Sequence, residues 1–318
     1  MERSAGILLH PTSLPSPFGI GDMGHDAHRW VDMLADHDQR LWQMCPLGPT
    51  GYGESPYQCR SSFAGNPLLI SPGLLVEDGL LTNREVEQYP SLPADQVDYE
   101  GVRSAKEPLF RAAFKRFSPS DDFAEFCRQE EAWLETYALY EVIRALQEQK
   151  PWYEWPPTLR ERKPKAIKEI QEGYKEELAY HRFVQYIFDR QWHRLRRHAN
   201  DRGVAIVGDI PYYCAYDSAD AWGNPEILEL EPKTLRPKRV AGVPPDYFSP
   251  TGQLWGNPVY DWDFLRSHGY EWWIRRIARC LEFSDWLRID HFRGFESFWA
   301  VPAGDETAVN GEWVSCPG

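Results

Sequence analysis

The 318-residue chain predicts an α/β fold with parallel strands, and two observations carry this prediction. Short apolar segments bounded by turn residues alternate along the chain with longer segments of helical periodicity. Such alternation is typical of a parallel sheet, because parallel neighbours need a crossover connection that is usually a helix. Hydrophobic residues make up 42% of the chain, which is enough for a substantial core.

Four segments are predicted to form buried strands: residues 5–10, 40–47, 204–210 and 285–292. The last three each follow an expected helix, at residues 25–37, about 174–200 and 270–283. The apolar faces expected for these helices contain Ala27, Trp30, Val31 and Leu34; Leu178, Phe183, Ile187 and Leu195; and Trp273, Ile274, Ile277 and Leu281.

The spacing of the strands predicts three parts in the chain. Residues 1–73 contain the first two strands, and residues 74–173 are expected to form an inserted, mainly helical subdomain. Residues 174–318 contain the third and fourth strands together with a long loop at 211–262. Loops of this length inside a compact domain are usually functional.

Charge and composition exclude several classes of protein. The formal net charge of −13 argues against a nucleic-acid partner, which would need a basic face. Six scattered cysteines without paired spacing indicate free thiols in a reducing cytoplasm. We expect neither a signal peptide nor a membrane helix, because no apolar run is long enough. The 14 Trp, 16 Tyr and 15 Phe are partly in loops, where aromatic rings are suitable platforms for sugars.

Arg288 and Asp290 stand two residues apart at the end of the fourth predicted strand, in the stretch WLRIDHFRGF. Residues i and i+2 of a strand point to the same face, so the guanidinium and the carboxylate are expected to be neighbours. A permanently charged arginine favours the ionised carboxylate, which suits a nucleophile better than a general acid. The same pattern is typical of a structural ion pair, and the local sequence leaves both interpretations open. Asp209 ends the third strand in the same way, which favours a functional role for this edge of the sheet.

Five stretches of the sequence resemble the 4-α-glucanotransferase family, also known as amylomaltases or disproportionating enzymes. They are GILLHPTSLPSPFGIGDMG, GYGESPYQCRSSFAGNP, GDIPYYCAYDSADAW, VAGVPPDYFSPTGQLWGNPVYDW and LRIDHFRGF with the following FWAVPAGDETAVNGEWVSCPG. The resemblance covers residues 3–318. It implies a (β/α)8 TIM-type barrel with helical insertions, of which about the first four βα units are present in this chain. The reaction it implies is transfer of an α-1,4-glucan segment to the 4-hydroxyl of glucose or another glucan.

The resemblance also implies roles for individual residues. Asp290 would be the catalytic nucleophile, with Arg288 positioning it and His291 bonding a sugar hydroxyl beside it. The substrate-binding residues would be Tyr57, which stacks on the donor sugar, Asp209, which binds that sugar, Ser55, Asp246, Gln253 and Trp255 around the cleft, and Tyr52 at a secondary glucan contact.

The implied chemistry is retaining double displacement on maltooligosaccharides and α-1,4-glucans, in maltodextrin, glycogen or starch metabolism. It needs neither a cofactor nor a metal, and His25 and His28 are expected to lie on a helix surface. The acid/base glutamate and a third aspartate of the family lie on later strands, and neither Glu296 nor Glu312 matches the acid position. We therefore expect this chain to be an inactive fragment when it is alone.

Other interpretations stay open at this point. An α-amylase-type glycoside hydrolase would share the same residues, and a non-catalytic glucan-binding protein would need only the aromatic platforms. GIGDMG, at residues 19–24, has the spacing of a dinucleotide-binding loop, but three prolines separate it from the preceding strand. The sequence indicates no particular protein partner.

Overall fold

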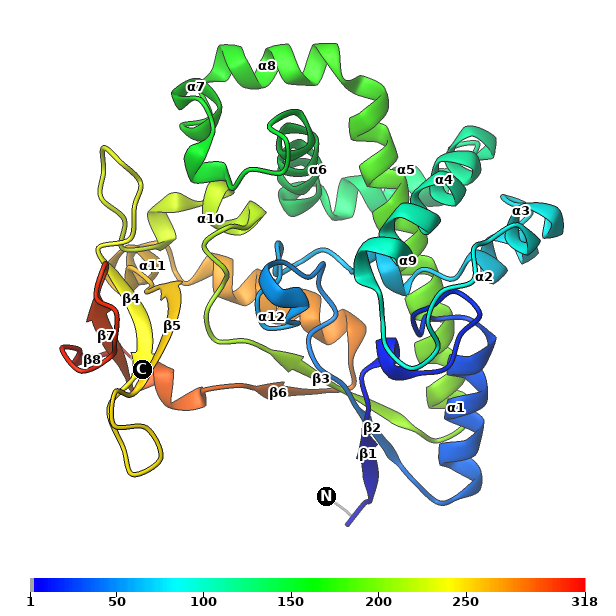
Figure 1. Cartoon of the computed structure of the whole chain (residues 1–318), viewed down its shortest axis with the longest axis horizontal. Coiled ribbons are helices and arrows are strands. Elements are labelled where there is room, and N and C mark those ends of the chain that lie inside the picture. Colours follow the sequence, from blue (N-terminus) through cyan, green and yellow to red (C-terminus); the bar gives the residue numbers. More distant parts are fainter. Residues whose placement is uncertain (1–2, 318) are drawn as a thin grey trace.

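The computed structural model describes residues 3–317 and contains two four-stranded sheets (Figure 1). The first sheet has the order β1-β2-β3-β6, and all three pairs of neighbours are parallel. Its strands are β1 (Gly6–Leu8), β2 (Leu41–Gln43), β3 (Ala205–Ile210) and β6 (Trp286–Ile289). Each lies within one of the four predicted segments, so the predicted parallel α/β class is confirmed.

The second sheet is antiparallel and was missed by the sequence analysis. It has the order β5-β4-β7-β8 and consists of β4 (Arg239–Val243), β5 (Gln253–Pro258), β7 (Ser297–Pro302) and β8 (Glu312–Ser315). The first two strands lie in the segment 211–262 that was expected to be a loop. Both strands contain a glycine and β5 ends in a proline, and these residues are depleted in sheets, so the sequence did not indicate strands here. Figure 1 shows this sheet beside the carboxyl ends of β3 and β6.

Helices α1 (His25–Asp36), α9 (Lys175–Asp201) and α12 (Glu271–Phe283) precede β2, β3 and β6, as predicted. The predicted apolar faces of α1 and α9 lie in the core or pack against it. His28 departs from the expected surface position, because its half-buried ring packs against His198 with 5.0 Å between ring centroids.

The predicted apolar face of α12 is right for two of its four residues. Trp273 is buried and Ile277 packs against the core, whereas Ile274 is 60% exposed and Leu281 is 46% exposed. The buried face consists of Trp272, Trp273, Arg276, Arg279 and Phe283. Arg276 is accommodated because its Nη1 donates to the carbonyl oxygen of Tyr212 (3.1 Å), and its guanidinium lies over two indole rings. Apolar periodicity therefore identified only part of the buried face of this helix and missed its buried arginines.

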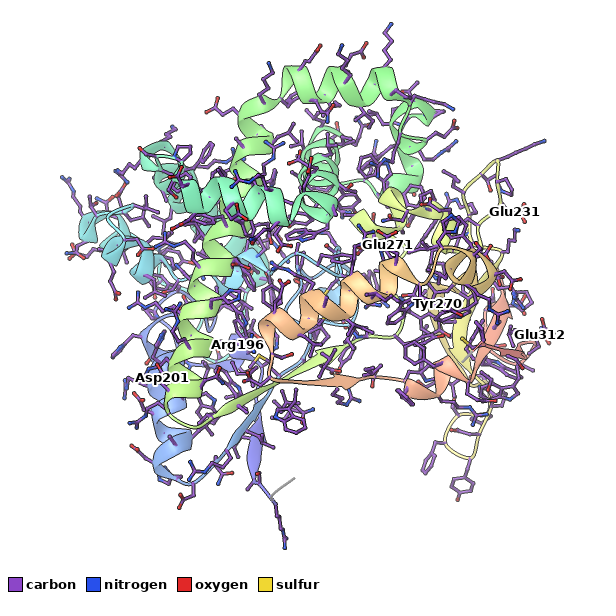
Figure 2. The ribbon with its side chains drawn as sticks, turned by 180° about the vertical axis from the view of Figure 1, so that it is seen from behind. Arg196, Asp201, Glu231, Tyr270, Glu271 and Glu312 are labelled. Atoms are coloured by element: carbon purple, nitrogen blue, oxygen red, sulfur yellow. The ribbon has the colours of Figure 1, made fainter. Side chains whose placement is uncertain are left out.

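The parallel sheet is covered on one face only. Trp42 and Ile206 point to the covered face and are fully buried, and Figure 2 shows α12 lying across β3 and β6, with Tyr270 and Glu271 at its beginning. The expectation of four buried strands is wrong for the two edge strands, since Leu8 is 61% and Trp286 is 47% exposed. The open face is the one to which Trp286 and Arg288 point.

Helices dominate the segment between β2 and β3. They are α2 (Pro72–Glu77), α3 (Asn83–Glu87), α4 (Tyr99–Arg116), α5 (Asp121–Gln129), α6 (Glu131–Leu146), α7 (Pro157–Arg160) and α8 (Pro164–Gly173). Two further helices, α10 (Ala219–Gly223) and α11 (Trp262–Ser267), follow β3. Most of these helices contribute to one core together with α9, and the division of the chain at residues 73 and 173 stays a prediction. Among residues 3–317, no helix has the length and apolar character needed to span a membrane.

Candidate functional site

Three charged side chains meet at the carboxyl ends of β3 and β6. Asp209 is in register with Arg288 across the two strands, and the backbone N–H of Asp290 donates to Ile210 of β3. Nη1 of Arg288 lies 2.8 and 2.9 Å from the two carboxylate oxygens of Asp209, and Nη2 lies 2.5 Å from Oδ1 of Asp290. The sequence analysis paired Arg288 with Asp290 alone, whereas the guanidinium bridges two carboxylates.

Asp209 is almost enclosed, at 8% exposure. Its Oδ2 also accepts a hydrogen bond of 2.5 Å from the hydroxyl of Tyr57. Burial raises the pKa of Asp209, while the hydrogen bond from Tyr57 and the charge of Arg288 oppose that rise. Burial and the neighbouring carboxylate in turn hold the pKa of Tyr57 above its ordinary value, so its proton stays in place to donate. Both oxygens of Asp209 are therefore occupied by protein groups.

Asp290 differs from Asp209 because its side chain is 39% exposed. Its Oδ1 accepts from Arg288, and no donor within residues 3–317 reaches its Oδ2. It lines an open cleft with an empty volume of about 770 Å³, and it is the only carboxylate among the described residues of that lining. The free oxygen thus belongs to a fixed, charge-compensated carboxylate beside a space large enough for a sugar.

His291 follows Asp290 with a left-handed backbone (φ 52°), which turns its ring toward aromatic neighbours. Trp255 packs against it edge-on, with ring centroids 5.0 Å apart, and Tyr213 stacks on it at 6.1 Å. Burial lowers the pKa of His291, which favours the neutral ring near pH 7 despite the charge of Asp290.

Two buried polar atoms in the cleft lining have no hydrogen-bond partner in the described part of the chain. They are Nε2 of His291 and the hydroxyl oxygen of Tyr213. Buried polar groups are normally paired, so these two atoms are suited to a hydroxyl-rich ligand or to water. The sequence analysis missed Tyr213, although the stretch PYYCAY directly follows the strand that carries Asp209.

The structure brings most of the predicted site residues together: Ser55, Tyr57, Trp255, Asp290 and His291 line the cleft, and Asp209 and Arg288 stand beside it. Gln253 is linked to it through Trp255, whose Nε1 donates to the Gln253 amide oxygen (3.1 Å).

Two predicted residues lie apart from this cleft. Asp246 is exposed on the connection between β4 and β5, where its Oδ1 accepts the backbone N–H groups of Phe248 and Ser249. Tyr52 is 92% exposed on a short 3-10 turn and does not line the cleft. Their predicted substrate-binding roles stay predictions.

The arrangement has the chemical character of a carbohydrate site. Aromatic rings offer apolar platforms, and a neutral imidazole and hydroxyls offer hydrogen bonds to sugar hydroxyl groups. Among residues 3–317, no group of three or more His, Cys, Asp or Glu side chains is placed to hold a metal ion.

Comparisons with known proteins agree with this character. A family model described as 4-alpha-glucanotransferase matches residues 9–318. The chain is 48% identical to a 4-alpha-glucanotransferase of Synechocystis and 49% identical to one of Aquifex aeolicus, covering 100% and 99% of this chain. In each case it spans 64% of the length of the relative.

A solved structure, the amylomaltase from Streptococcus agalactiae in complex with acarbose, superimposes with a TM-score of 0.94 at 37% identity. The match covers 99% of this chain and 65% of that one. The predicted fold, a TIM-type barrel of which the first four βα units are present, is therefore confirmed. On its sequence and its fold, the chain belongs to the 4-α-glucanotransferase family.

Proposed function

We propose that this chain supplies the nucleophile and the donor-sugar site of a 4-α-glucanotransferase. The enzyme would move a segment of an α-1,4-glucan to the 4-hydroxyl of glucose or of another glucan, in cytoplasmic maltodextrin, glycogen or starch metabolism. One observation carries the proposal: Arg288 holds one oxygen of Asp290, the other oxygen has no donor among residues 3–317, and Asp290 lines an aromatic-walled cleft. The Streptococcus agalactiae amylomaltase was solved with acarbose, which supports the view that this cleft binds a sugar chain.

The proposed mechanism is a retaining double displacement. Oδ2 of Asp290 attacks the anomeric carbon of the donor sugar, and a covalent glucosyl ester forms as the leaving oxygen departs. Arg288 compensates the negative charge of Asp290 before the attack and fixes the direction of its carboxylate. Tyr57, His291 and Trp255 hold the sugar, and an acceptor hydroxyl then replaces the enzyme at the anomeric carbon.

The reaction also needs a general acid, and this requirement concerns the activity of residues 1–318 on their own. Retaining enzymes protonate the leaving oxygen with a second carboxyl group about 5–5.5 Å from the first. Asp209 is occupied by Arg288 and Tyr57, and no other carboxylate of residues 3–317 lines the cleft with Asp290. We therefore expect the purified 318-residue polypeptide to leave maltotriose unchanged. Release of glucose or redistribution of maltotriose chains would contradict this expectation.

A donor with an activated leaving group tests the nucleophile without the acid. Fluoride departs without protonation, so α-glucosyl fluoride should glucosylate Asp290 in this chain. Azide needs no general base, so it should then react with the glucosyl ester and release α-glucosyl azide. The expected product has the α configuration, because two inversions give retention. A β product, or the same rate from an Asp290→Ala variant, would overturn the double displacement.

Two alternatives make different predictions. In an enzyme that also contains the acid/base carboxyl group, a hydrolase activity of the α-amylase type would release glucose from maltotriose as readily as it forms transfer products with added maltose. A non-catalytic glucan-binding protein would bind maltotriose equally well after Asp290→Ala and would form no azide product. The names of the three relatives reported above favour transfer, because each is called a 4-alpha-glucanotransferase or an amylomaltase.

A further inference from the structure

A second cavity lies away from the Asp290 cleft, between α12 and the junction of α5 and α6, with α10 at one end. Its empty volume is about 730 Å³, and it shares no lining residue with the cleft. Gln129, Ala132 and Ala278 at its border are exposed, so the cavity opens to solvent. We call it the α12 pocket.

Three fixed aromatic rings form the apolar part of the α12 pocket. Phe63 lies nearly parallel to Trp133, with 6.5 Å between centroids and 14° between planes. Phe63 also meets Trp272 at 81° and 6.0 Å. All three side chains are at most 8% exposed, so their positions are set by packing. Rigid rings at right angles to one another suit a ligand with apolar C–H faces.

The polar part of the α12 pocket contains two buried donors that form no hydrogen bond with the described residues. Nε1 of Trp272 is buried, and no acceptor within residues 3–317 reaches it, although the residue is only 4% exposed. Nε of Arg275, one helical turn further along α12, is also buried; it forms no hydrogen bond with the described residues, and its charge is paired with Glu271 at 3.9 Å. An unpaired buried donor at the wall of a cavity, such as Nε1 of Trp272, indicates water or a ligand that accepts hydrogen bonds.

The charges around the α12 pocket nearly cancel. Glu130, Asp220 and Glu282 bring three carboxylates, and Arg275 and Arg279 bring two guanidinium groups. Arg279 Nη1 lies 2.6 Å from Glu282 and 3.4 Å from Glu130, so part of the acidic charge is compensated in place. An anionic ligand is disfavoured because three carboxylates line the pocket. A cationic ligand is disfavoured because the arginines already compensate most of that negative charge. Interleaved donors and acceptors on aromatic walls match a neutral molecule with many hydroxyl groups.

We propose that the α12 pocket is a second binding site, which takes one hexose unit, either free glucose or the end of a maltooligosaccharide. Each polar group named above has a hydroxyl donor or acceptor as its natural counterpart. The hexose class follows from the pocket itself. The choice of glucose among hexoses rests on the proposed function of the cleft.

The test uses the indole N–H signals of the complete 318-residue chain labelled with ¹⁵N-tryptophan. The signal of Trp272 is identified by its absence in a Trp272→Phe variant, and that of Trp255 by its absence in Trp255→Phe. Titration with glucose and with maltose should shift the Trp272 signal in a saturable manner. Inorganic phosphate should leave it in place.

Two substitutions on the same helix provide the matched comparison. Ala278→Trp fills the pocket and should lower the apparent affinity for glucose, measured from the Trp272 signal, at least tenfold. Ile274→Trp, on the outer side of α12, should leave that affinity unchanged. The proposal is overturned if Trp272 does not respond to either sugar, if phosphate alone moves it, or if Ala278→Trp responds like the unchanged chain. Movement of Trp272 without movement of Trp255 would support the α12 pocket and count against the cleft, so the two proposals fail separately.

Discussion

The two ends of strand β6 carry an aspartate each, and the two carboxylates are held in opposite ways. Oδ1 of Asp285, before the strand, accepts from Nε and Nη2 of Arg196 at 3.2 and 2.8 Å. Its Oδ2 accepts from the Asn200 amide and from the backbone N–H of Ile206, both at 2.8 Å. Figure 2 shows Arg196 on α9 beside this end of the strand. Burial alone would raise the pKa of Asp285, but these hydrogen bonds outweigh it and lower the pKa.

Asp290, after the strand, has a single arginine partner on one oxygen and none among the described residues on the other. Four donors make Asp285 an anchor that joins α9, β3 and β6. An arginine–aspartate pair is therefore not enough to tell a structural carboxylate from a reactive one. The two differ in how many of their carboxylate oxygens already accept hydrogen bonds from the protein. On this comparison the ion-pair interpretation fits Asp285, and the nucleophile interpretation fits Asp290.

Removing each carboxylate gives the largest expected contrast. Asp285→Ala removes the carboxylate that pairs with the partly buried guanidinium of Arg196 and leaves the buried backbone N–H of Ile206 without its partner, and should lower the free energy of unfolding by about 3 kcal/mol. Asp290→Ala should lower it by less than about 1 kcal/mol, because the lost pair is partly exposed. Urea denaturation of both variants measures the two values. Equal losses would show that the Arg288–Asp290 pair is as structural as the one at the other end.

Asp220 extends the comparison to a fully buried aspartate and to pH. At 4% exposure it is more enclosed than Asp285 or Asp290, and it has few donors, chiefly the backbone N–H of Ser62, so burial prevails and raises its pKa to about 6. A raised pKa means that the folded state binds the proton more tightly. Stability therefore falls as pH rises from the unfolded-state value of 3.8 toward 6, opposite in sign to the contribution of Asp285, which is lost as pH falls.

Asp220→Asn removes this ionisation while its amide oxygen still accepts from Ser62. The stability of the variant relative to the parent should increase by at most about 3 kcal/mol between pH 4 and pH 7.5. Thermal denaturation at both pH values measures the change. A constant difference between variant and parent would show that Asp220 ionises normally in the folded state.

Tyr212 and Tyr213, which follow β3, show the same difference between a polar group paired within the protein and an unpaired one, with smaller expected effects. The hydroxyl of Tyr212 donates to the carbonyl oxygen of Gly294 at 2.6 Å, whereas that of Tyr213 has no partner among the described residues. Tyr212→Phe should therefore cost about 1 kcal/mol of stability. Tyr213→Phe should leave stability unchanged and weaken maltotriose binding about tenfold, the value of one hydrogen bond to a ligand. Calorimetric titration and urea denaturation together check the pair, and a loss of stability in Tyr213→Phe would contradict the assignment.

The apolar periodicity of the sequence and its turn residues predicted the parallel strands and the helices before them, because both depend on which residues within one segment are buried. These signals missed part of the buried face of α12, where Arg276 and Arg279 are buried by hydrogen bonds and aromatic rings that come from distant segments. They also missed the antiparallel sheet, two of whose strands contain glycine and two of which contain proline. The bridge from Arg288 to Asp209 depends on the register between β3 and β6, which no single segment contains. The strand-end pattern singled out Asp209, Arg288 and Asp290 and the resemblance implied their roles, whereas the unpaired hydroxyl of Tyr213 required the folded structure.

The central claim is that Asp290 is a nucleophile whose free oxygen is available for attack. Mass spectrometry of the 318-residue chain after incubation with α-glucosyl fluoride tests it most directly. We predict that the peptide containing Asp290 gains the mass of one glucosyl unit, that the ester accumulates because no base resolves it, and that Asp290→Asn abolishes the label while Asp285→Asn keeps it. No label, or a label that persists in Asp290→Asn, would contradict the account.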